Sequence, residues 1–354
     1  MAQKGAEVHI ACATDQTASR PEGGITVHPV VQDWGKKGAR DIEKALKSVR
    51  PDWAVVQYAP HNFHPKGLPF GVFAFYRAFL RQAVPVLTVF HEVRIRPWGG
   101  PKNAVVSFLQ MRIANRLARA SARVVTSIDI YAGYLRNWRH KTALVPVGSN
   151  IPPVAVAPAR AQKIRERLGI AAGDPVVCTF GNRGISPYLA AFDSLAEDFP
   201  NLIWLICGRN PTPPDILSSR PYIRYVGEMG VSDVYEHLSL GDVFFTPDLV
   251  GQPRGDGGTC NKSGSLACGC SLGIPVVGAK GDMNNALLEH GKNILLVNIL
   301  EKEALRGAIE SCFSSKEKAA QLGRNARKLY DEALDWPVLA EKLLAHMSDE
   351  KRNN

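Results

Sequence analysis

Short apolar runs alternate with amphipathic segments along the whole chain, a pattern typical of parallel sheets wrapped by helices. In the first half, the apolar runs predict strands at 8–13, 53–58, 85–90, 123–126 and 143–147. In the second half, they predict strands at 176–180, 202–207, 223–226, 243–246, 275–277 and 294–297. The predicted fold class is therefore α/β, with two Rossmann-like, doubly wound domains.

The segments between these strands have apolar residues at helical spacing. They predict helices at 70–83, 103–120, 187–198, 232–240, 263–272, 302–313, 316–332 and 336–347. In the second of these, Val106, Ile113 and Leu117 belong to one apolar stripe, with basic residues beside it. We expect this stripe to face the core of its domain rather than a membrane.

A proline-rich segment at 149–160 predicts a stiff connector between the two domains, because proline interrupts helices and central strands. We expect one domain at 1–150, a second at 151–334, and a last helix within 335–354 that returns to the first domain. Ligands of doubly wound folds bind at the carboxyl ends of the strands. The expected architecture therefore places the chemistry in a cleft between the domains.

The composition indicates a globular protein of the cytoplasm. The 354 residues are 45% hydrophobic and 21% charged, and no apolar run reaches the roughly 18 residues of a membrane span. The first residues lack the pattern of a signal peptide. Seven cysteines, an odd number scattered among apolar segments, predict reduced thiols rather than disulfides or a metal site.

The positive charge is concentrated in the first half. Residues 1–150 contain 21 Lys and Arg against 9 Asp and Glu, whereas the remainder contains 22 against 24. A basic face of this kind attracts anionic lipid headgroups, a phosphorylated acceptor or nucleic acid, and it can also be a solvated helix surface. We expect peripheral contact with an anionic membrane, and no nucleic-acid binding, because no recognised nucleic-acid motif accompanies the charge.

The stretch RGDGGTCNKSGSLACGCSLGIPVV at 254–277 contains a glycine-rich loop followed by a helix and a buried strand. The glycines at 255, 257 and 258 predict amides that turn toward an anion, and Ser263 predicts a helix cap. The first turn of that helix and Lys262 would complete a phosphate cradle. The alternative is an ordinary strand-to-helix turn in which the glycines serve geometry alone.

Several motifs follow one another in the second half. They are FGNRG at 180–184, LICGR at 205–209, YVGEM at 225–229, LGDVFFTP at 240–247, LGIPVVGAKG at 272–281, EHGKNILLV at 289–297 and LGRNAR at 322–327. In this order they resemble the nucleotide-sugar-binding domain of retaining glycosyltransferases with the GT-B fold, family four (glycosyl transferases group 1). The first half is similar more loosely, through HE at 91–92 and VPVGSNIP at 145–152.

The resemblance implies a nucleoside diphosphate sugar as donor and a sugar transfer with retention of configuration. The expected catalytic residues are His91 and Arg183, which match the family pattern, with Lys262 in place of a missing lysine and Asp256 as the acid that contacts the sugar hydroxyls. The implied donor-binding residues are Gly181, Gly208, Glu228, Met229, Gly258, Ser263, Gly264 and Ser265. No Asp-x-Asp pair is present to hold a metal, so we expect metal-independent transfer without a cofactor, in which helix amides and cations carry the diphosphate.

The acceptor side follows from the same resemblance and from the basic first half. We expect a lipid-linked or glycan acceptor and a role in cell-envelope or polysaccharide biosynthesis. His91 follows a predicted strand and is the expected donor-site histidine, although a histidine that bonds only within its loop fits the same pattern.

The chain departs from the family pattern at three places. The lysine expected after Arg183 is replaced by Pro187 and Tyr188, and the paired glutamates of the donor loop are replaced by Cys260 and Cys268. The first domain is expected to lack its opening strand. These departures leave open a catalytically impaired binding or assembly subunit. A nucleotide-sugar epimerase is a further alternative, but it needs acid and base carboxylates that are scarce here.

Overall fold

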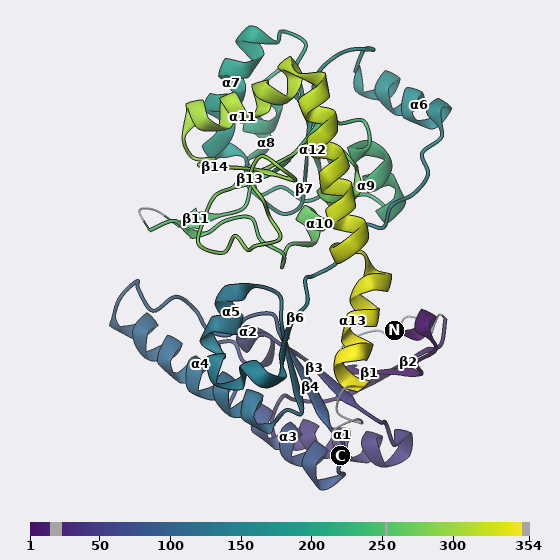
Figure 1. Ribbon diagram of the computed structural model, residues 1–354, viewed down its shortest axis with the longest axis vertical. Helices are drawn as coiled ribbons and strands as arrows, with labels where there is room; N and C mark the ends of the chain where they lie inside the picture. The colour runs from purple at the N-terminus through teal and green to yellow at the C-terminus, as the bar shows by residue number, and fades with distance from the viewer. Residues whose placement is uncertain (15–22, 252–253, 349–354) are drawn as a thin grey trace. The chain divides into compact units, whose positions relative to one another are not determined.

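The computed structural model describes residues 1–14, 23–251 and 254–348, and the chain forms two compact units (Figure 1). Unit 1 comprises Met1–Pro146 together with Leu339–Asn354, and unit 2 comprises Val147–Val338. The main sheet of each unit is parallel and is accompanied by helices. No described helix is both long and apolar enough to cross a membrane.

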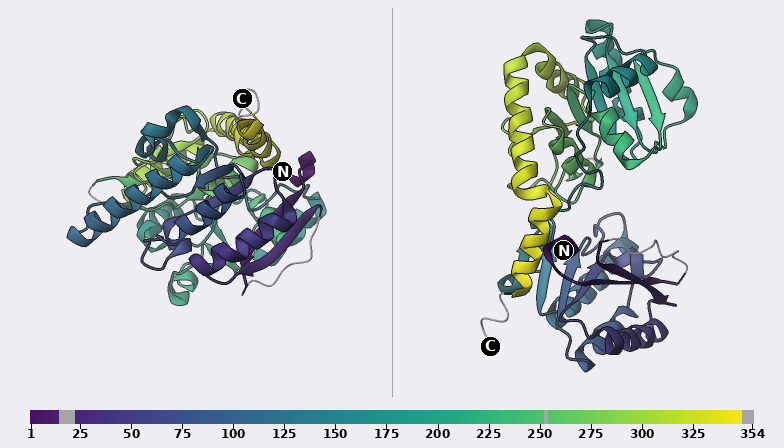
Figure 2. Two further views of the ribbon diagram at one scale, coloured as in Figure 1. Left: turned by 90° about the horizontal axis from the view of Figure 1, so that it is seen from below. Right: turned by 90° about the vertical axis from the view of Figure 1, so that its right-hand side faces the viewer.

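The main sheet of unit 1 has four parallel strands. They are β3 (Ala54–Tyr58), β4 (Val86–Phe90), β5 (Arg123–Thr126) and β6 (Thr142–Leu144), paired in that order. A separate parallel pair, β1 (Val8–Ala13) with β2 (Ile25–Val31), is drawn in dark purple in Figure 2. The predicted strands of this unit are all present, although β6 ends before 147.

Strand β2 is not among the predicted strands, and Pro29 explains the omission. A proline within an apolar run argues against a central strand because it cannot donate to the ladder. In the structure, Pro29 lies opposite Cys12, where the register of the pair shifts. The pair has only two strands, so both are edge strands, where a proline is tolerated.

The helices of unit 1 connect these strands. They are α1 (Lys36–Val49), α2 (Pro60–Phe63), α3 (Val72–Arg81), α4 (Pro101–Ala120) and α5 (Asp129–Tyr134), with short 3-10 segments at Ala2–Lys4 and Arg136–Lys141. Ile113 and Leu117 of α4 are buried. The apolar stripe of this helix therefore faces the core over its C-terminal half, as expected.

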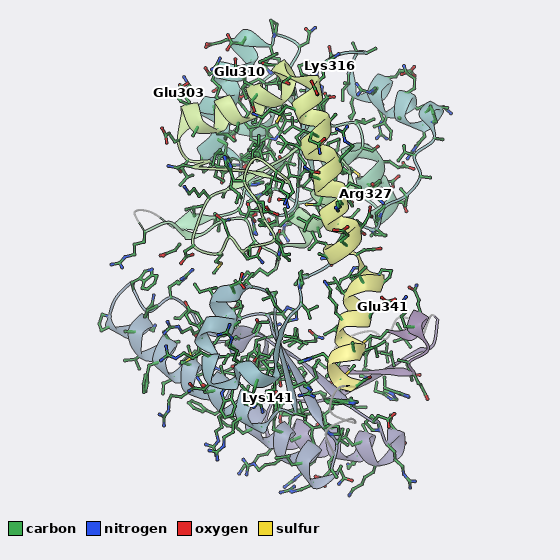
Figure 3. The ribbon with its side chains drawn as sticks, viewed as in Figure 1. Lys141, Glu303, Glu310, Lys316, Arg327 and Glu341 are labelled. Carbon is green, nitrogen blue, oxygen red and sulfur yellow. The ribbon has the colours of Figure 1, made fainter. Side chains whose placement is uncertain are left out.

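The last helix, α13 (Trp336–Ser348), contributes to the core of unit 1. Leu339 and Met347 pack against Leu87, Val125 and Val145 of this unit. At the surface, Lys4 forms an ion pair with Glu341, which Figure 3 labels. The chain therefore completes the core of unit 1 with residues from its far end.

Unit 2 contains a six-stranded parallel sheet in the order β14-β13-β10-β7-β8-β9. The strands are β7 (Val176–Phe180), β8 (Ile203–Cys207), β9 (Ile223–Gly227), β10 (Val243–Thr246), β13 (Val276–Ala279) and β14 (Leu295–Val297). All six lie at predicted positions. They were predictable because strands covered on both faces are continuous apolar runs.

The helices of unit 2 cover both faces of this sheet. They are α6 (Pro158–Leu168), α7 (Leu189–Asp198), α8 (Pro214–Ser218), α9 (Val231–Leu238), α10 (Gly264–Ser271), α11 (Lys302–Ser314) and α12 (Lys316–Leu329). Two further turns, Ser186–Tyr188 and Tyr330–Leu334, and a small hairpin of β11 (Val250–Gly251) and β12 (Asp256–Gly257) complete the unit.

One detail corrects the predictions for this unit. The expected connector at 149–160 is shorter, because Pro158 occupies the first position of α6. A proline is favourable there, since the first amide of a helix has no acceptor within it. The core, by contrast, is as apolar as expected. The rings of Phe192 and Trp204 stack with centroids 3.6 Å apart, and the indole N–H of Trp204 donates to Thr179 at 3.0 Å.

Candidate functional site

The order of the strands in unit 2 indicates where a ligand binds. From β7 the chain proceeds through β8 to β9 on one side, and then returns to β10 on the other side of β7. The loops that leave β7 and β10 therefore run in opposite directions. Open parallel sheets bind ligands beyond the carboxyl ends of the strands at such a switch point. The candidate site is consequently formed by the segments that follow Phe180 and Thr246.

The loop after β7 passes close to helix α10. Gly181 has a φ of +118°, which glycine adopts without strain. A Cβ on Gly181 would lie 3.0 Å from Oγ of Ser265, in the first turn of α10. Gly181 therefore permits a close approach between this loop and the helix start. Two predicted donor-binding residues are adjacent in the structure.

Helix α10 begins at the position that the sequence predicts. Oγ of Ser263 accepts a hydrogen bond from the backbone N–H of Leu266 at 3.3 Å, which caps the helix. A Cβ on Gly264 would lie 3.4 Å from the carbonyl oxygen of Gly148. The N–H groups of a first helical turn have no acceptor within the helix and carry the positive end of its dipole. This end of α10 is thus suited to an anion.

The glycine loop before α10 does not supply the amides that the sequence predicts. The N–H of Gly255 donates to Gly251 at 2.8 Å, and the N–H of Gly258 donates to Leu249 at 3.0 Å. The N–H of Gly257 donates to Oδ1 of Asp282 at 2.8 Å. These three amides stabilise the β11–β12 hairpin and its surroundings. The prediction that they turn toward an anion is therefore wrong.

These glycines instead allow neighbouring backbone segments to approach one another closely. Gly258 has a φ of +93°, and a Cβ there would lie 2.8 Å from the backbone nitrogen of Gly281. The predicted sugar-contacting residue, Asp256, lies in β12 opposite Gly251 and is half-buried. The hairpin thus fixes the loop that leads into α10 against the segment after β13.

Arg183 lies beside a buried carboxylate that the sequence analysis missed. Nη2 of Arg183 is 3.4 Å from Oδ1 of Asp248, which follows β10. Oδ2 of Asp248 accepts a hydrogen bond from the hydroxyl of Thr246 at 2.9 Å. The Asp248 residue is 7% exposed, whereas the Arg183 side chain is 44% exposed. The guanidinium therefore has solvent on one side and the carboxylate on the other.

Burial raises the pKa of the Asp248 carboxyl, and the Thr246 hydrogen bond and the charge of Arg183 offset part of that rise. Asp248 comes two residues after a buried strand at the switch point. The rule that functional side chains follow the carboxyl ends of such strands could have identified it from the sequence.

The remaining residues of the predicted cradle lie in the same segment. Lys262 is half-buried and immediately precedes the cap of α10. Its backbone N–H bonds the thiol of Cys260, whose pKa is nevertheless raised by burial. Burial also raises the pKa of Cys268, inside α10, to about 12. Both cysteines at the expected glutamate positions are therefore neutral thiols.

Three other predicted donor-binding residues follow the neighbouring strands β8 and β9. Gly208 has a φ of +89°, and its N–H donates to Gly227 at 2.8 Å. A Cβ on Gly208 would contact the ring of Phe180 at 3.4 Å, so it lies beside the loop after β7. Glu228 is exposed, and Met229 packs partly against the core after the edge strand β9.

His91 belongs to unit 1 and directly follows β4. Its ring Nε2 lies 2.6 Å from Oε1 of Gln57 on the neighbouring strand β3. Its backbone N–H donates to the carbonyl oxygen of Tyr58 at 2.9 Å. The histidine is thus held at the carboxyl end of the unit 1 sheet, where functional residues of parallel sheets lie.

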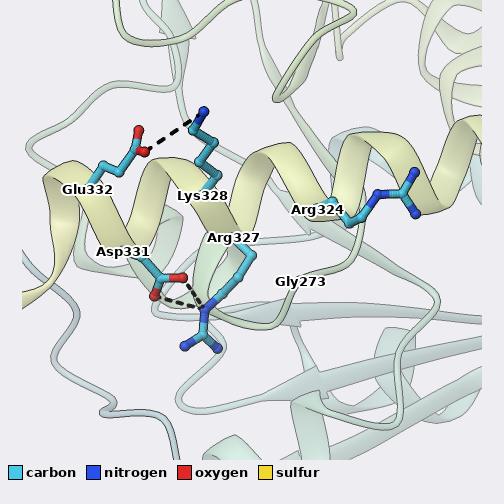
Figure 4. A pocket seen from close by; sticks show the side chains of 6 residues that line it. All are labelled: Gly273, Arg324, Arg327, Lys328, Asp331 and Glu332. Carbon is cyan, nitrogen blue, oxygen red and sulfur yellow. Dashed lines mark hydrogen bonds and ion pairs between the residues drawn. The ribbon is translucent and has the colours of Figure 1, made fainter.

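An open depression of about 500 Å³ lies elsewhere on unit 2 (Figure 4). Its lining residues are Gly273, Arg324, Arg327, Lys328, Asp331 and Glu332. Most of its charges are paired between α12 and the following turn at Tyr330–Leu334, with Arg327 bonded to Asp331 at 2.9 Å and Lys328 near Glu332 at 3.8 Å. Gly273 precedes β13, so the depression lies at the amino end of the sheet and is not the candidate site.

Comparison with solved structures shows which fold this arrangement belongs to. Sucrose-phosphate synthase from Thermosynechococcus elongatus is 16% identical, covers 100% of this chain and 91% of its own, and has a TM-score of 0.69. HepE from Anabaena, solved with UDP-glucose, is 18% identical over 93% of this chain and 87% of its own, with a TM-score of 0.65. This chain has the GT-B fold.

The GT-B fold by itself does not decide the reaction. UDP-GlcNAc 2-epimerase from Neisseria meningitidis, solved with UDP-GlcNAc, is also similar, at 12% identity over 88% of this chain and 80% of its own, with a TM-score of 0.51. No protein-family model matches the sequence, and the comparison with curated proteins gives no match. Function must therefore be argued from the GT-B site itself.

Proposed function

We propose that this chain is a retaining glycosyltransferase that moves a sugar from a nucleoside diphosphate sugar to an acceptor hydroxyl without a metal. One observation carries the proposal. At the switch point of unit 2, the capped first turn of α10 packs against Gly181, and the segments from which Arg183 and Lys262 project adjoin it. Helix amides and cations together form an anion site of the kind that holds a diphosphate.

The proposed reaction requires little from the protein beyond stabilisation of the developing charge. As the bond between the sugar and the diphosphate breaks, negative charge develops on the leaving phosphate. In a front-side reaction, the acceptor hydroxyl attacks from the same face and gives its proton to that phosphate, so the configuration is retained. Arg183, Lys262 and the α10 amides would stabilise the charge. No protein nucleophile is required, which is compatible with thiols at positions 260 and 268.

Donor transfer is tested by incubating the purified protein with a panel of uridine, guanosine and adenosine diphosphate sugars. We expect release of the nucleoside diphosphate, by hydrolysis or by transfer to an added acceptor, and we expect the rate to survive a chelator. Retention is read from the anomeric configuration of the product by NMR. Neither turnover nor calorimetric binding with any donor would contradict the proposal.

A second candidate is a binding or assembly subunit that holds the nucleotide without turnover. The observation that favours it is the burial of Cys260 and Cys268, because a neutral buried thiol cannot replace a carboxylate in contact with a sugar. Saturable nucleotide binding with no product of any kind would support this candidate over transfer. An epimerase would instead convert the donor to its epimer, and the product would still be a nucleotide sugar.

We also propose that unit 1 contacts an anionic membrane through helix α4, consistent with a lipid-linked acceptor. The helix contains no acidic residue. Val105 and Phe108 are 58% and 61% exposed, although both are apolar. Arg112 and Arg119 follow them at spacings that place all four on one face of the helix. Exposed apolar side chains can insert at a membrane surface while neighbouring arginines contact anionic headgroups, because a long basic side chain keeps its charge at the polar interface.

Flotation with vesicles separates this contact from a solvated helix face. We expect the protein to float with phosphatidylglycerol-containing vesicles at low salt, and to be released as salt screens the charge. Arg112→Glu with Arg119→Glu should abolish flotation. The charge-matched control, Lys36→Glu with Lys37→Glu on the exposed start of α1, should retain it. Flotation that depends on neither anionic lipid nor salt would contradict the proposal.

A further inference from the structure

Asp248 is a buried carboxylate at the point where the proposed donor diphosphate binds. It is held from several sides. Arg183 faces it from the loop after β7, Thr246 bonds it from β10, and Thr259 bonds it from the segment before α10. The phenol of Tyr188 and the thiol of Cys260 lie close enough to feel its charge. Of these neighbours, Arg183 supplies the positive charge.

The negative charge of the Asp248 carboxylate is only partly balanced by its neighbours. The Arg183 contact is long, at 3.4 Å, and that guanidinium is partly in solvent. A buried charge is stable only when its partner holds it closely and further hydrogen bonds satisfy its lone pairs. The carboxylate therefore depends on an arginine that the proposed function assigns to the donor diphosphate.

We propose that Asp248 couples nucleoside diphosphate binding to the uptake of one proton. This inference rests on the proposed donor site. When the diphosphate binds, Arg183 turns from the carboxylate to the phosphate oxygens, and Asp248 takes a proton from solvent. Asp248 thereby acts as a positioning residue that holds the guanidinium at the site while no phosphate is bound.

Two electrostatic changes drive this uptake. The incoming phosphates place negative charge near the carboxylate, and Arg183 transfers part of its stabilisation to them. Each change favours the neutral carboxylic acid. The protonated form keeps Oδ2 as acceptor for Thr246 and gains an O–H donor on the side that faced Arg183. Burial already raises the pKa of Asp248 in the free protein, so the further rise begins above the ordinary value.

The direction of the pH dependence follows by linkage. Because the bound state holds one proton more than the free state, affinity for the diphosphate falls as pH rises through the window between the two Asp248 pKa values. Below that window the residue is already neutral in both states, and the dependence on this residue vanishes. In a variant that lacks the carboxylate, the dependence on this residue is absent at every pH.

Isothermal titration calorimetry of UDP, GDP and ADP into the full chain tests the proposal. Each titration is run at one pH in two buffers with different ionisation enthalpies, which gives the number of protons taken up. The terminal phosphate of the ligand also titrates, but it contributes equally to every variant. We expect Asp248→Asn to take up one proton fewer than wild type, or a fraction of one outside the centre of the window, and to bind several-fold more tightly at neutral pH.

Asp242→Asn is the matched control. Asp242 lies at the opposite, amino end of β10, and its pKa is also raised by burial. Its carboxylate accepts a bond from the N–H of Val176 at 2.8 Å, which an asparagine oxygen can replace. We expect proton uptake in this variant to equal that of wild type. Equal uptake in Asp248→Asn and wild type would overturn the inference, as would an equal loss of uptake in both variants.

Two further outcomes keep the inference separate from the proposed function. If none of the three diphosphates binds, the proposed donor site fails and this inference fails with it. If one binds but wild-type affinity for the corresponding nucleotide sugar is constant between pH 5 and pH 8, the donor site stands and the inference alone is overturned. The second measurement needs no variant, because the diphosphate of a nucleotide sugar has no titrating group near neutral pH.

Discussion

At the scale of single residues, the proposed donor site has fewer cations than the resemblance calls for. The position where the resemblance calls for a lysine is occupied by Pro187 and Tyr188, and Tyr188 is buried. In the proposed function, Arg183 therefore balances a larger share of the diphosphate charge. Its side chain is nearly half exposed and reaches Asp248 only at 3.4 Å, so it can move to a ligand without disrupting the core.

Arg183→Ala should weaken nucleoside diphosphate binding about tenfold to a hundredfold, since a hydrogen bond to a charged group contributes roughly 1.5–3 kcal/mol. The affinity of Arg183→Lys should lie between those of wild type and Arg183→Ala, because lysine keeps the charge but loses the planar arrangement of donors. Calorimetry measures both. Lys163→Ala, on the exposed face of α6, removes the same charge elsewhere and should have no effect. Equal affinities in wild type and Arg183→Ala would contradict the assignment.

Asp248 should also affect stability, with a sign that follows from its pKa. Burial raises this pKa in the folded chain, so the folded state binds a proton more readily than the unfolded state near and above the ordinary Asp value of about 3.9. The contribution of Asp248 to stability is therefore lost as pH rises through the folded pKa. Asp248→Asn should be at least as stable as wild type at pH 7, and its stability should fall less as pH rises from about 4 to 7. Thermal unfolding at both pH values checks this, and a variant less stable than wild type at pH 7 would contradict it.

At the scale of elements, the position of helix α10 depends on a glycine that packs directly against strand β10. A Cβ on Gly269 would lie 2.3 Å from Cδ1 of Phe244, a fully buried ring on β10. The helix therefore lies directly on the strand, and its first turn is brought to the switch point by this contact. An element placed by such close packing cannot shift without moving the site.

Gly269→Ala should destabilise unit 2 by about 1–3 kcal/mol, the usual cost of overpacking a core, and should weaken nucleotide binding as α10 is displaced. Urea unfolding and calorimetry measure the two effects. Gly307→Ala offers a matched control inside α11, because no atom beyond the adjacent backbone of its own helix lies within 4 Å of the added Cβ. That variant should be neutral or more stable, since alanine favours a helix. A Gly269→Ala variant with wild-type stability and affinity would contradict this account of α10.

The sequence predicted the helices and strands of unit 2 better than the hydrogen-bond and ion-pair partners of its loop residues. Its strands are apolar runs, and Ser263 precedes the α10 periodicity, so both are encoded locally. The amides of Gly257 and Gly258 were misassigned because their acceptors, Asp282 and Leu249, lie outside the glycine run. Asp248 was missed because no motif contains it. Its importance comes from burial and from Arg183, which are properties of the folded chain.

At the scale of the whole molecule, the chain order and the compact units do not coincide. Unit 1 is formed from the first 146 residues and from the segment that begins at Leu339. Leu339 is 1% exposed and packs with Leu87 and Val125, and the ring of His346 lies 3.1 Å from the carbonyl oxygen of Val124. Unit 1 therefore needs the end of the chain for its core, whereas unit 2 is continuous.

This division predicts how the protein unfolds. Leu339→Ala removes a buried side chain from unit 1 and should cost that unit about 2–5 kcal/mol, whereas Phe192→Ala removes the stacked partner of Trp204 and should cost unit 2 about 3–5 kcal/mol. Because each unit has its own core, we expect two calorimetric transitions, with each variant lowering a different one. Nucleoside diphosphate should raise the transition that Phe192→Ala lowers, since its proposed site is formed by unit 2. If both variants lowered the same transition, the assignment of Leu339 to a separate core would be wrong.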